Sequence, residues 1–188
     1  MQVAYLDQIV HETSDVPEFF IAPAICEFYT RMTGLMNGQG LPRYADLDLM
    51  DMYRLAPDIM IIDVDQISCR NRLRFVGTRV VEVLGRETTG MFIDQIEIGP
   101  FRSQQLSAFN QAVASKKLQW TFVNTQLAAL PVLRPVRLST CSYERLIVPC
   151  VDSFGEITHL AAIMQYAESS GRNNEFRHRE IDVALAQR

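Results

Sequence analysis

Five stretches of the chain are rich in apolar and β-branched residues, partly alternating with polar ones, and are bounded by turn residues. Residues 58–66 and 72–77 lie on either side of a short polar turn and predict a hairpin. Residues 118–130, 137–152 and 157–167 follow one another and predict an antiparallel meander. We therefore expect one five-stranded antiparallel sheet, in which the first strand pairs with the last.

Helical spacing marks other segments. Apolar residues recur every three to four positions in residues 17–34 and predict an amphipathic helix, which Pro23 kinks or delays. Its apolar stripe must be covered, either by a second copy of the chain or by its own sheet. Further short helices are expected over residues 45–57, 78–84, 89–96 and 103–115, with a charged helix closing the chain. The expected class is α+β, with short lid helices over one concave face of the sheet.

Glycine and proline divide the chain. The stretch GLMNGQGLP, residues 34–42, has three glycines and a proline and is the best linker candidate. We therefore predict an N-terminal extension with an amphipathic helix and a linker over residues 1–40, a main domain over 41–168 and a C-terminal helix over 169–188. Residues 1–16 are weakly patterned and are expected to be peripheral.

Charge and hydropathy narrow the class of partner. Lys and Arg number 18 against 22 Asp and Glu, for a net charge of −4, and no long basic cluster is present. This composition argues against nucleic-acid binding along a phosphate-tracking surface. The longest apolar run, residues 19–26, is far short of the ~20 residues of a membrane-spanning helix. No secretory signal is recognisable, so we expect a cytoplasmic protein with reduced cysteines.

Four motifs occur in a characteristic order: LAPDIMIIDV at 55–64, LRFVGT at 73–78, TTGMFID at 88–94 and YERLIVP at 143–149. Together they resemble a PAS domain, and more narrowly a group of short alphaproteobacterial PAS-like proteins of unknown function. The resemblance covers roughly residues 40–167. Each motif alone is of common composition, and the specificity comes from their order and spacing.

The resemblance implies a bacterial sensory or interaction module for signal transduction. PAS domains hold a ligand between the sheet and the lid helices, or dimerise through an N-terminal helix, and pass a change to a partner. Here the helix over residues 17–34 would be the dimerising element. We expect a stand-alone module, a homodimer through that helix, that binds a small molecule or a signalling protein and has no catalysis of its own.

The sequence lacks the residues that PAS domains use for haem binding and for covalent flavin photochemistry. A haem-binding PAS domain uses a histidine on the long lid helix, and residues 103–115 contain none. His159, on the last strand, is expected to be satisfied within the sheet. Light-sensing flavin chemistry needs a cysteine in the lid motif, and ETTGMFID at residues 87–94 has none. Haem and covalent flavin photochemistry are therefore disfavoured, whereas a non-covalently bound flavin stays open.

The alternative from another class is a small isomerase- or hydrolase-like enzyme that uses the concave cavity. Asp63 or Asp94, if buried there, could act as a general base. Both acids are more simply explained as strand ends or turn caps. Glu175 and His178 have the spacing of two metal ligands, but a solvated helix face is the simpler interpretation, so no metal site is predicted.

The remaining candidate is the cavity itself. Aromatic and methionine side chains from the sheet and the lid suit an apolar ligand, and they equally suit a filled core. The pocket candidates are Ile61, Phe75, Met91, Phe92, Phe109, Trp120, Phe122 and Met164.

Overall fold

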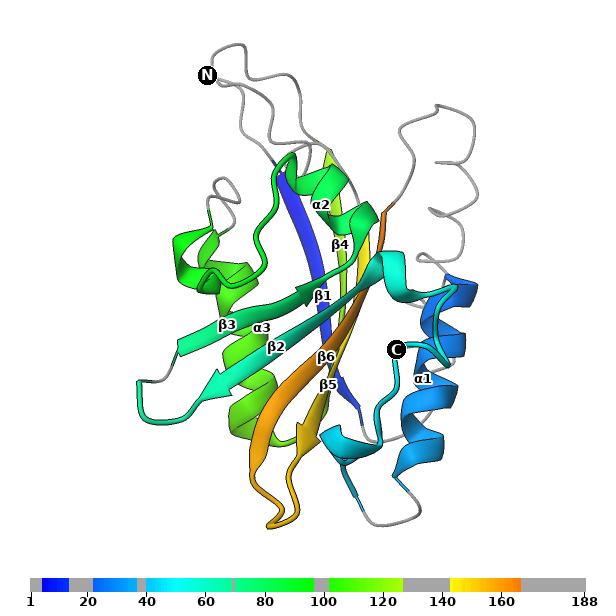
Figure 1. Cartoon of the computed structure of the whole chain (residues 1–188). Helices are drawn as coiled ribbons and strands as arrows, with labels where there is room; N and C mark the ends of the chain where they lie inside the picture. Colours follow the sequence, from blue (N-terminus) through cyan, green and yellow to red (C-terminus); the bar gives the residue numbers. More distant parts are fainter. Residues whose placement is uncertain are drawn as a thin grey trace.

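The computed structural model describes residues 5–13, 22–36, 40–68, 70–96, 102–126 and 143–166. Within these residues six strands form one antiparallel sheet in the order β1-β4-β5-β6-β2-β3 (Figure 1). Their bounds are β1 Tyr5–Thr13, β2 Ile59–Asp65, β3 Arg70–Val76, β4 Leu118–Gln126, β5 Tyr143–Val151 and β6 Ile157–Tyr166.

The five predicted strands are β2 to β6. Strands β2 and β3 form the hairpin, and β4, β5 and β6 form the meander. The first of the five pairs with the last, since Ile59 of β2 lies opposite Ile163 of β6. The predicted α+β class and strand pairing are therefore confirmed, while the sheet has one strand more than predicted.

The additional strand is β1. It pairs with β4 along its whole length, from Tyr5 opposite Gln126 to Thr13 opposite Leu118. The prediction that residues 1–16 are peripheral is therefore wrong for residues 5–13. An edge strand is held largely by backbone hydrogen bonds to one neighbour, so its sequence pattern is weaker than that of a central strand.

The helices are α1 Pro23–Leu35, α2 Thr78–Leu84 and α3 Arg102–Ser115, with 3₁₀ turns η1 Tyr44–Asp46, η2 Ala56–Asp58 and η3 Ile93–Gln95. Pro23 occupies the first position of α1, so it delays the start of the helix rather than kinking it. The helix predicted over 45–57 is wrong: the Asp48 carboxylate accepts a hydrogen bond from the Met50 N–H, at 2.8 Å, and holds a turn.

The helix predicted over residues 89–96 is also wrong, because this segment runs along the outer edge of β3. The Leu73 N–H donates to the Met91 carbonyl at 2.9 Å, and the Gly90 N–H donates to the Leu73 carbonyl at 2.6 Å. These bonds cover the open edge of the sheet, and only the 3₁₀ turn η3 remains helical. The C-terminal helix predicted over 169–188 lies outside the described residues.

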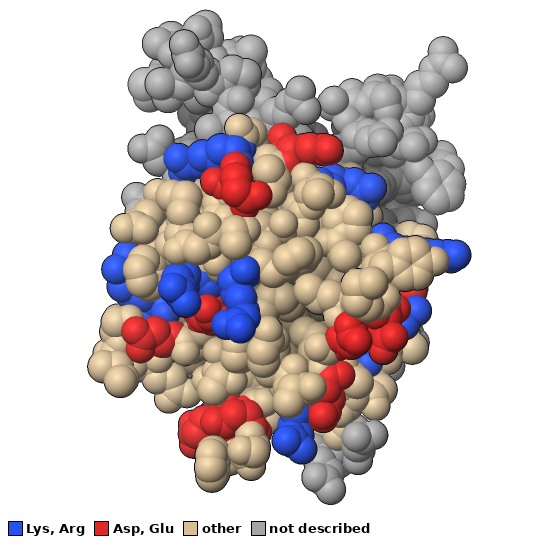
Figure 2. Space-filling view, viewed as in Figure 1, with Lys and Arg blue, Asp and Glu red and all other residues tan. Residues whose placement is uncertain are grey.

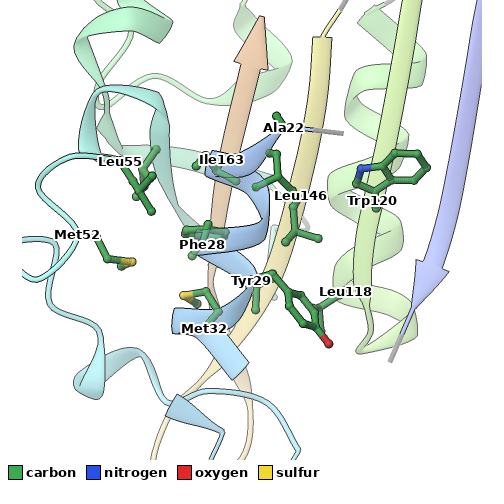
Figure 3. Close-up of a cluster of buried hydrophobic side chains, with 14 of the residues drawn as sticks. Ala22, Phe28, Tyr29, Met32, Met52, Leu55, Leu118, Trp120, Leu146 and Ile163 are labelled. Carbon is green, nitrogen blue, oxygen red and sulfur yellow. The ribbon is translucent and has the colours of Figure 1, made fainter. Parts of the chain in front are cut away.

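Both faces of the sheet are covered: the lid helices lie on one face, as predicted, and α1 covers the other. Figure 3 shows the cluster under α1, in which Phe28 and Met32 of the helix meet Leu146 and Ile163 of the sheet. We call this cluster the α1-side core. Its buried members are Ala22, Ile25, Phe28, Tyr29, Met32, Met52, Leu55, Ile59, Ile61, Leu118, Trp120, Phe122, Leu146, Val148, Cys150, Ala161 and Ile163.

This packing determines what the apolar stripe of α1 contacts. Ile25, Phe28, Tyr29 and Met32 are buried against the chain's own sheet. Of the two coverings considered for this stripe, the chain's own sheet is therefore the one found, while a homodimer through residues 17–34 stays a prediction. Within the described residues, β1 pairs with β4 and α1 packs on the sheet, and the predicted division of the chain into residues 1–40, 41–168 and 169–188 stays a prediction.

Helices α2 and α3 and the turn η3 pack on the opposite face, where they form the lid (Figure 1). We call this cluster the lid-side core. Its buried members are Met60, Ile62, Leu73, Val76, Val80, Ile93, Ile96, Ala108, Phe109, Ala112, Tyr143, Ile147, Ile157, Leu160, Ala162 and Met164.

A β-bulge on the β2–β3 hairpin decides which face receives each side chain. Ile61 pairs with Phe75 and Ile62 pairs with Leu73, so Arg74 is the additional residue between them. Leu73 and Phe75 are two apart, yet Leu73 belongs to the lid-side core and Phe75 packs against the α1-side core. Without the bulge, both would lie on one face.

Candidate functional site

A cavity of about 50 Å³ lies between the sheet and the lid. Its walls are apolar side chains from the sheet, α2, η3 and α3, together with a single charged residue, Arg145 of β5. The half-buried Leu84 and Tyr166 form part of the wall, so the cavity opens toward the surface on their side. The lining residues are Met60, Leu73, Val80, Leu84, Ile93, Ile96, Phe109, Arg145, Met164 and Tyr166.

Arg145 is the most unusual residue of this cavity, since its side chain is only 1% exposed. Its guanidinium lies over the Phe109 ring, with Cζ 4.9 Å from the ring centroid, and 5.9 Å from that of Tyr143. Burial lowers the pKa of Arg145, although an arginine in a protein remains charged. The cavity therefore presents one positive charge within an apolar wall.

The structure divides the eight predicted pocket residues between the two faces. Phe109 and Met164 line the cavity, and Met91 packs against the lid-side core. Phe92 lies beneath the Arg70 guanidinium, whose Cζ is 3.7 Å from the ring centroid. The other four lie on the α1 side and do not line this cavity: Ile61, Phe75, Trp120 and Phe122. The bulge accounts for Phe75, and the strand alternation accounts for the rest.

Glu144, the neighbour of Arg145 on β5, faces the α1-side core and is also 1% exposed. Its Oε2 accepts a hydrogen bond from the Ala22 N–H, at the start of α1, at 2.8 Å. Its Oε1 accepts one from the Trp120 indole N–H at 2.7 Å. The carboxylate therefore joins the N-terminus of α1, where a negative charge is favoured, to β4 and β5.

Sequence reasoning missed both charged residues of β5, although YERLIVP was recognised as a motif. In a sheet covered on one face, one of two adjacent charges reaches water, so only the other needs an explanation. The available signal was the pair Glu144-Arg145 within a run that is otherwise apolar. Cys150, at the end of the same strand, packs in the α1-side core, and burial raises the pKa of its thiol to about 12.

The two acids considered as general bases are held in ion pairs. Asp94 receives two hydrogen bonds from Arg70, at 2.9 and 2.8 Å. The Asp63 carboxylate accepts one hydrogen bond from the Arg72 guanidinium, at 3.1 Å, and one from the Arg74 guanidinium, at 3.2 Å. Figure 2 shows basic side chains gathered around acidic ones on this face, over β2 and β3. Neither acid lines the lid cavity.

His159 belongs to the same cluster as Asp63. Its Nε2 lies 3.4 Å from Asp63 Oδ1, and its ring stacks on Tyr44 with centroids 3.5 Å apart. Burial lowers the pKa of His159; the carboxylate of Asp63 opposes this change, and the nearby Arg74 adds to it. The predicted interpretation of His159 as a satisfied sheet histidine agrees with these contacts.

This arrangement predicts a pH dependence of stability. Because the pKa of His159 is lower in the folded protein, the unfolded chain takes up the proton first as the pH falls. The stabilising contribution is therefore present above the unfolded pKa, about 6.5, and is lost as the pH falls below it. In urea titrations at pH 7.5 and 5.5, His159→Gln should lose less stability on acidification than the parent protein. Equal losses in the two proteins would contradict the assignment.

The size of the lid cavity bears on cofactors. Cofactor pockets measure roughly 300–1,000 Å³, so this cavity of about 50 Å³ is small by comparison. No cysteine lies among its lining residues. Among the described residues, no group of three or more His, Cys, Asp or Glu side chains could hold a metal ion. In the same residues, no helix is long and apolar enough to cross a membrane.

No family model matches the chain, and no curated protein matches it in sequence. Among solved structures, an RNA-binding Light-Oxygen-Voltage receptor matches at 15% identity with a TM-score of 0.50, over 98% of this chain and 44% of that one. The LOV domain of the blue-light photoreceptor Aureochrome1, in its dark structure, matches at 12% identity with a TM-score of 0.45, over 76% of this chain and 96% of that one.

The chain thus spans less than half the length of the RNA-binding receptor that it resembles. At this level of identity the likeness shows the fold and nothing of the ligand. The order of motifs along the sequence predicted a PAS-like fold, while the resemblance to the alphaproteobacterial group stays a prediction. The chain has a PAS-like α+β fold with an antiparallel sheet and lid helices.

Proposed function

We propose that this chain is a PAS-type sensory or regulatory module that acts by binding, without catalysis of its own. Its ligand is a small molecule with a carboxylate and a short apolar chain, bound between the sheet and the lid. The observation that carries the proposal is the buried guanidinium of Arg145 in an otherwise apolar cavity. The PAS-like fold supports it, because sensing is the general role of such domains.

The chemistry of the cavity selects the ligand class. A guanidinium offers a planar fork of donors that matches a carboxylate, and the pair is strong where water is excluded. The side chains of Met60, Phe109 and Met164 provide apolar contact for the remainder of the ligand. A volume of about 50 Å³ holds only a few heavy atoms, so the apolar chain extends toward the mouth at Leu84 and Tyr166.

Binding would change how the lid packs on the sheet. Helices α2 and α3 and the turn η3 contribute Val80, Phe109 and Ile93 to the cavity wall. A ligand wedged against them would displace these elements relative to β5 and β6. We propose that a signalling partner protein senses this displacement on the outer surface of the lid.

Thermal unfolding with sodium acetate, butyrate and hexanoate tests the proposal, with sodium chloride matched in ionic strength. We expect at least one carboxylate to raise Tm in a saturable manner. Arg145→Met, of similar length but uncharged, should abolish this increase, whereas Arg145→Lys should retain a weaker one. The reason is that a lysine keeps the charge but not the planar fork.

Arg31→Met is the matched control, since Arg31 is exposed on α1 and pairs with Glu27 far from the cavity. It should leave the response to carboxylates unchanged. If none of the carboxylates raises Tm, or if Arg145→Met responds as the parent does, the proposed ligand class is wrong.

A further inference from the structure

A second and larger hollow lies at the hairpin end of the lid-side layer, with a volume of about 490 Å³. It is formed by the end of β2, the start of β3, the C-terminal half of α3 and the start of β6. None of its lining residues lines the lid cavity. Its volume falls within the range of about 300–1,000 Å³ that is usual for small-molecule sites. We call it the hairpin groove.

The groove has an apolar floor. Val64 and Ile157 come from the sheet and Val113 from α3, and all three belong to or pack against the lid-side core. Aliphatic side chains of this kind pack well against a flat ring. The floor therefore suits a ligand with one apolar planar part.

Two carboxamides form one wall. Asn71 Nδ2 donates to Asn110 Oδ1 at 3.0 Å, which ties β3 to α3. This bond leaves the carbonyl oxygen of Asn71 as an acceptor, and Asn110 keeps its own NH₂ group as a donor beside the second lone pair of its Oδ1. An adjacent donor and acceptor is the arrangement by which asparagine recognises the edge of adenine.

The charged residues of the groove differ in whether the protein itself already binds their side chains. Asp65 accepts hydrogen bonds from the backbone and hydroxyl of Ser68 and closes the β2–β3 turn. Lys116 and Glu156 are exposed and take part in no ion pair with the residues that the structure describes. Lys116 follows α3 with a φ of 55°, a left-handed conformation for which glycine is the usual residue. A lysine at this position places a cation at the groove.

From these features we infer that the hairpin groove is a binding site for an adenine mononucleotide. The base lies on Val64, Val113 and Ile157, with its edge on the Asn71–Asn110 pair. Lys116 binds the phosphate, and Glu156 accepts hydrogen bonds from the ribose hydroxyls. This site is separate from the lid cavity and does not depend on the carboxylate proposed there.

Isothermal titration calorimetry with adenosine 5′-monophosphate tests the inference, with adenosine and ribose 5-phosphate as the two partial ligands. We expect saturable binding of the mononucleotide and weaker binding of adenosine. Lys116→Gln should lower the affinity for the mononucleotide at least tenfold and leave the affinity for adenosine unchanged, because only the phosphate contact is lost. Asn110→Ala should lower the affinity for both ligands, because both contain the base.

Lys117→Gln is the matched control, since Lys117 is the adjacent lysine and does not line the groove. It should leave the affinity for the mononucleotide unchanged. The inference is overturned if neither adenosine nor its monophosphate binds. It is equally overturned if Lys117→Gln weakens binding as much as Lys116→Gln, since the effect would then be one of general charge.

Discussion

Replacing Gly77 by alanine is expected to lower the free energy of unfolding by about 3 kcal/mol, the upper part of the range for overpacked cores. Gly77 lies between β3 and α2, and its N–H donates to the Ile59 carbonyl at 2.8 Å. A Cβ at this position would collide with the backbone carbonyl oxygens of Ala56 and Pro57. A backbone cannot move aside as a flexible side chain does, so the chain must shift at the start of both β2 and α2.

Urea unfolding followed by circular dichroism measures this effect. The control is Gly34→Ala in α1, because a Cβ there meets nothing within 4 Å and the residue is helical. It should stabilise the protein by about 0.5–1 kcal/mol through the loss of backbone freedom in the unfolded chain. The steric argument fails if Gly77→Ala changes stability by less than about 1 kcal/mol.

Replacing Glu144 by glutamine is expected to cost about 2 kcal/mol. Glutamine has one carbonyl oxygen where glutamate has two acceptors, so its NH₂ group must face either the Ala22 N–H or the Trp120 indole N–H. One buried donor then loses its acceptor. The negative charge at the N-terminus of α1 is lost as well.

Trp120 is the only tryptophan of the chain, so its fluorescence reports directly on this change. We expect Glu144→Gln to alter its emission in the folded state and to lower the urea midpoint. Hydrogen exchange of the first amides of α1 should become faster. Glu27→Gln is the control, because its exposed pair with Arg31 contributes less than about 0.5 kcal/mol. Unchanged emission and stability in Glu144→Gln would show that the carboxylate is not the link between α1 and β4.

The five strands β2 to β6 could be predicted because each combines apolar patterning with clear turn residues. Thr78–Leu84 was predicted as a helix for the same reason, and Gly85, in the left-handed conformation with a φ of 72°, ends it. In the two segments predicted wrongly as helices, other hydrogen bonds replace those of a helix. Asp48 favours a turn over the helix expected there, and the edge of β3 binds Gly90 and Met91.

The candidate site was only partly predictable. The sequence indicates that Phe109 and Met164 are apolar and regularly spaced, and the structure places both on the cavity. It does not indicate the bulge at Arg74, which sends Phe75 to the other face. It also does not indicate that α1 covers the second face, which is what makes Glu144 a buried residue.

The adjacent placement of an acid and a base on β5 also bears on how the chain avoids misfolding. If β5 slipped by one residue against β4 and β6, Glu144 would enter the lid-side core and Arg145 the α1-side core. The carboxylate would then lose the Ala22 and Trp120 donors, and the guanidinium would lose the Phe109 ring. A purely apolar strand would tolerate such a slip far better, since either face accepts an aliphatic side chain. The charged pair therefore fixes the alignment of the central strand during folding.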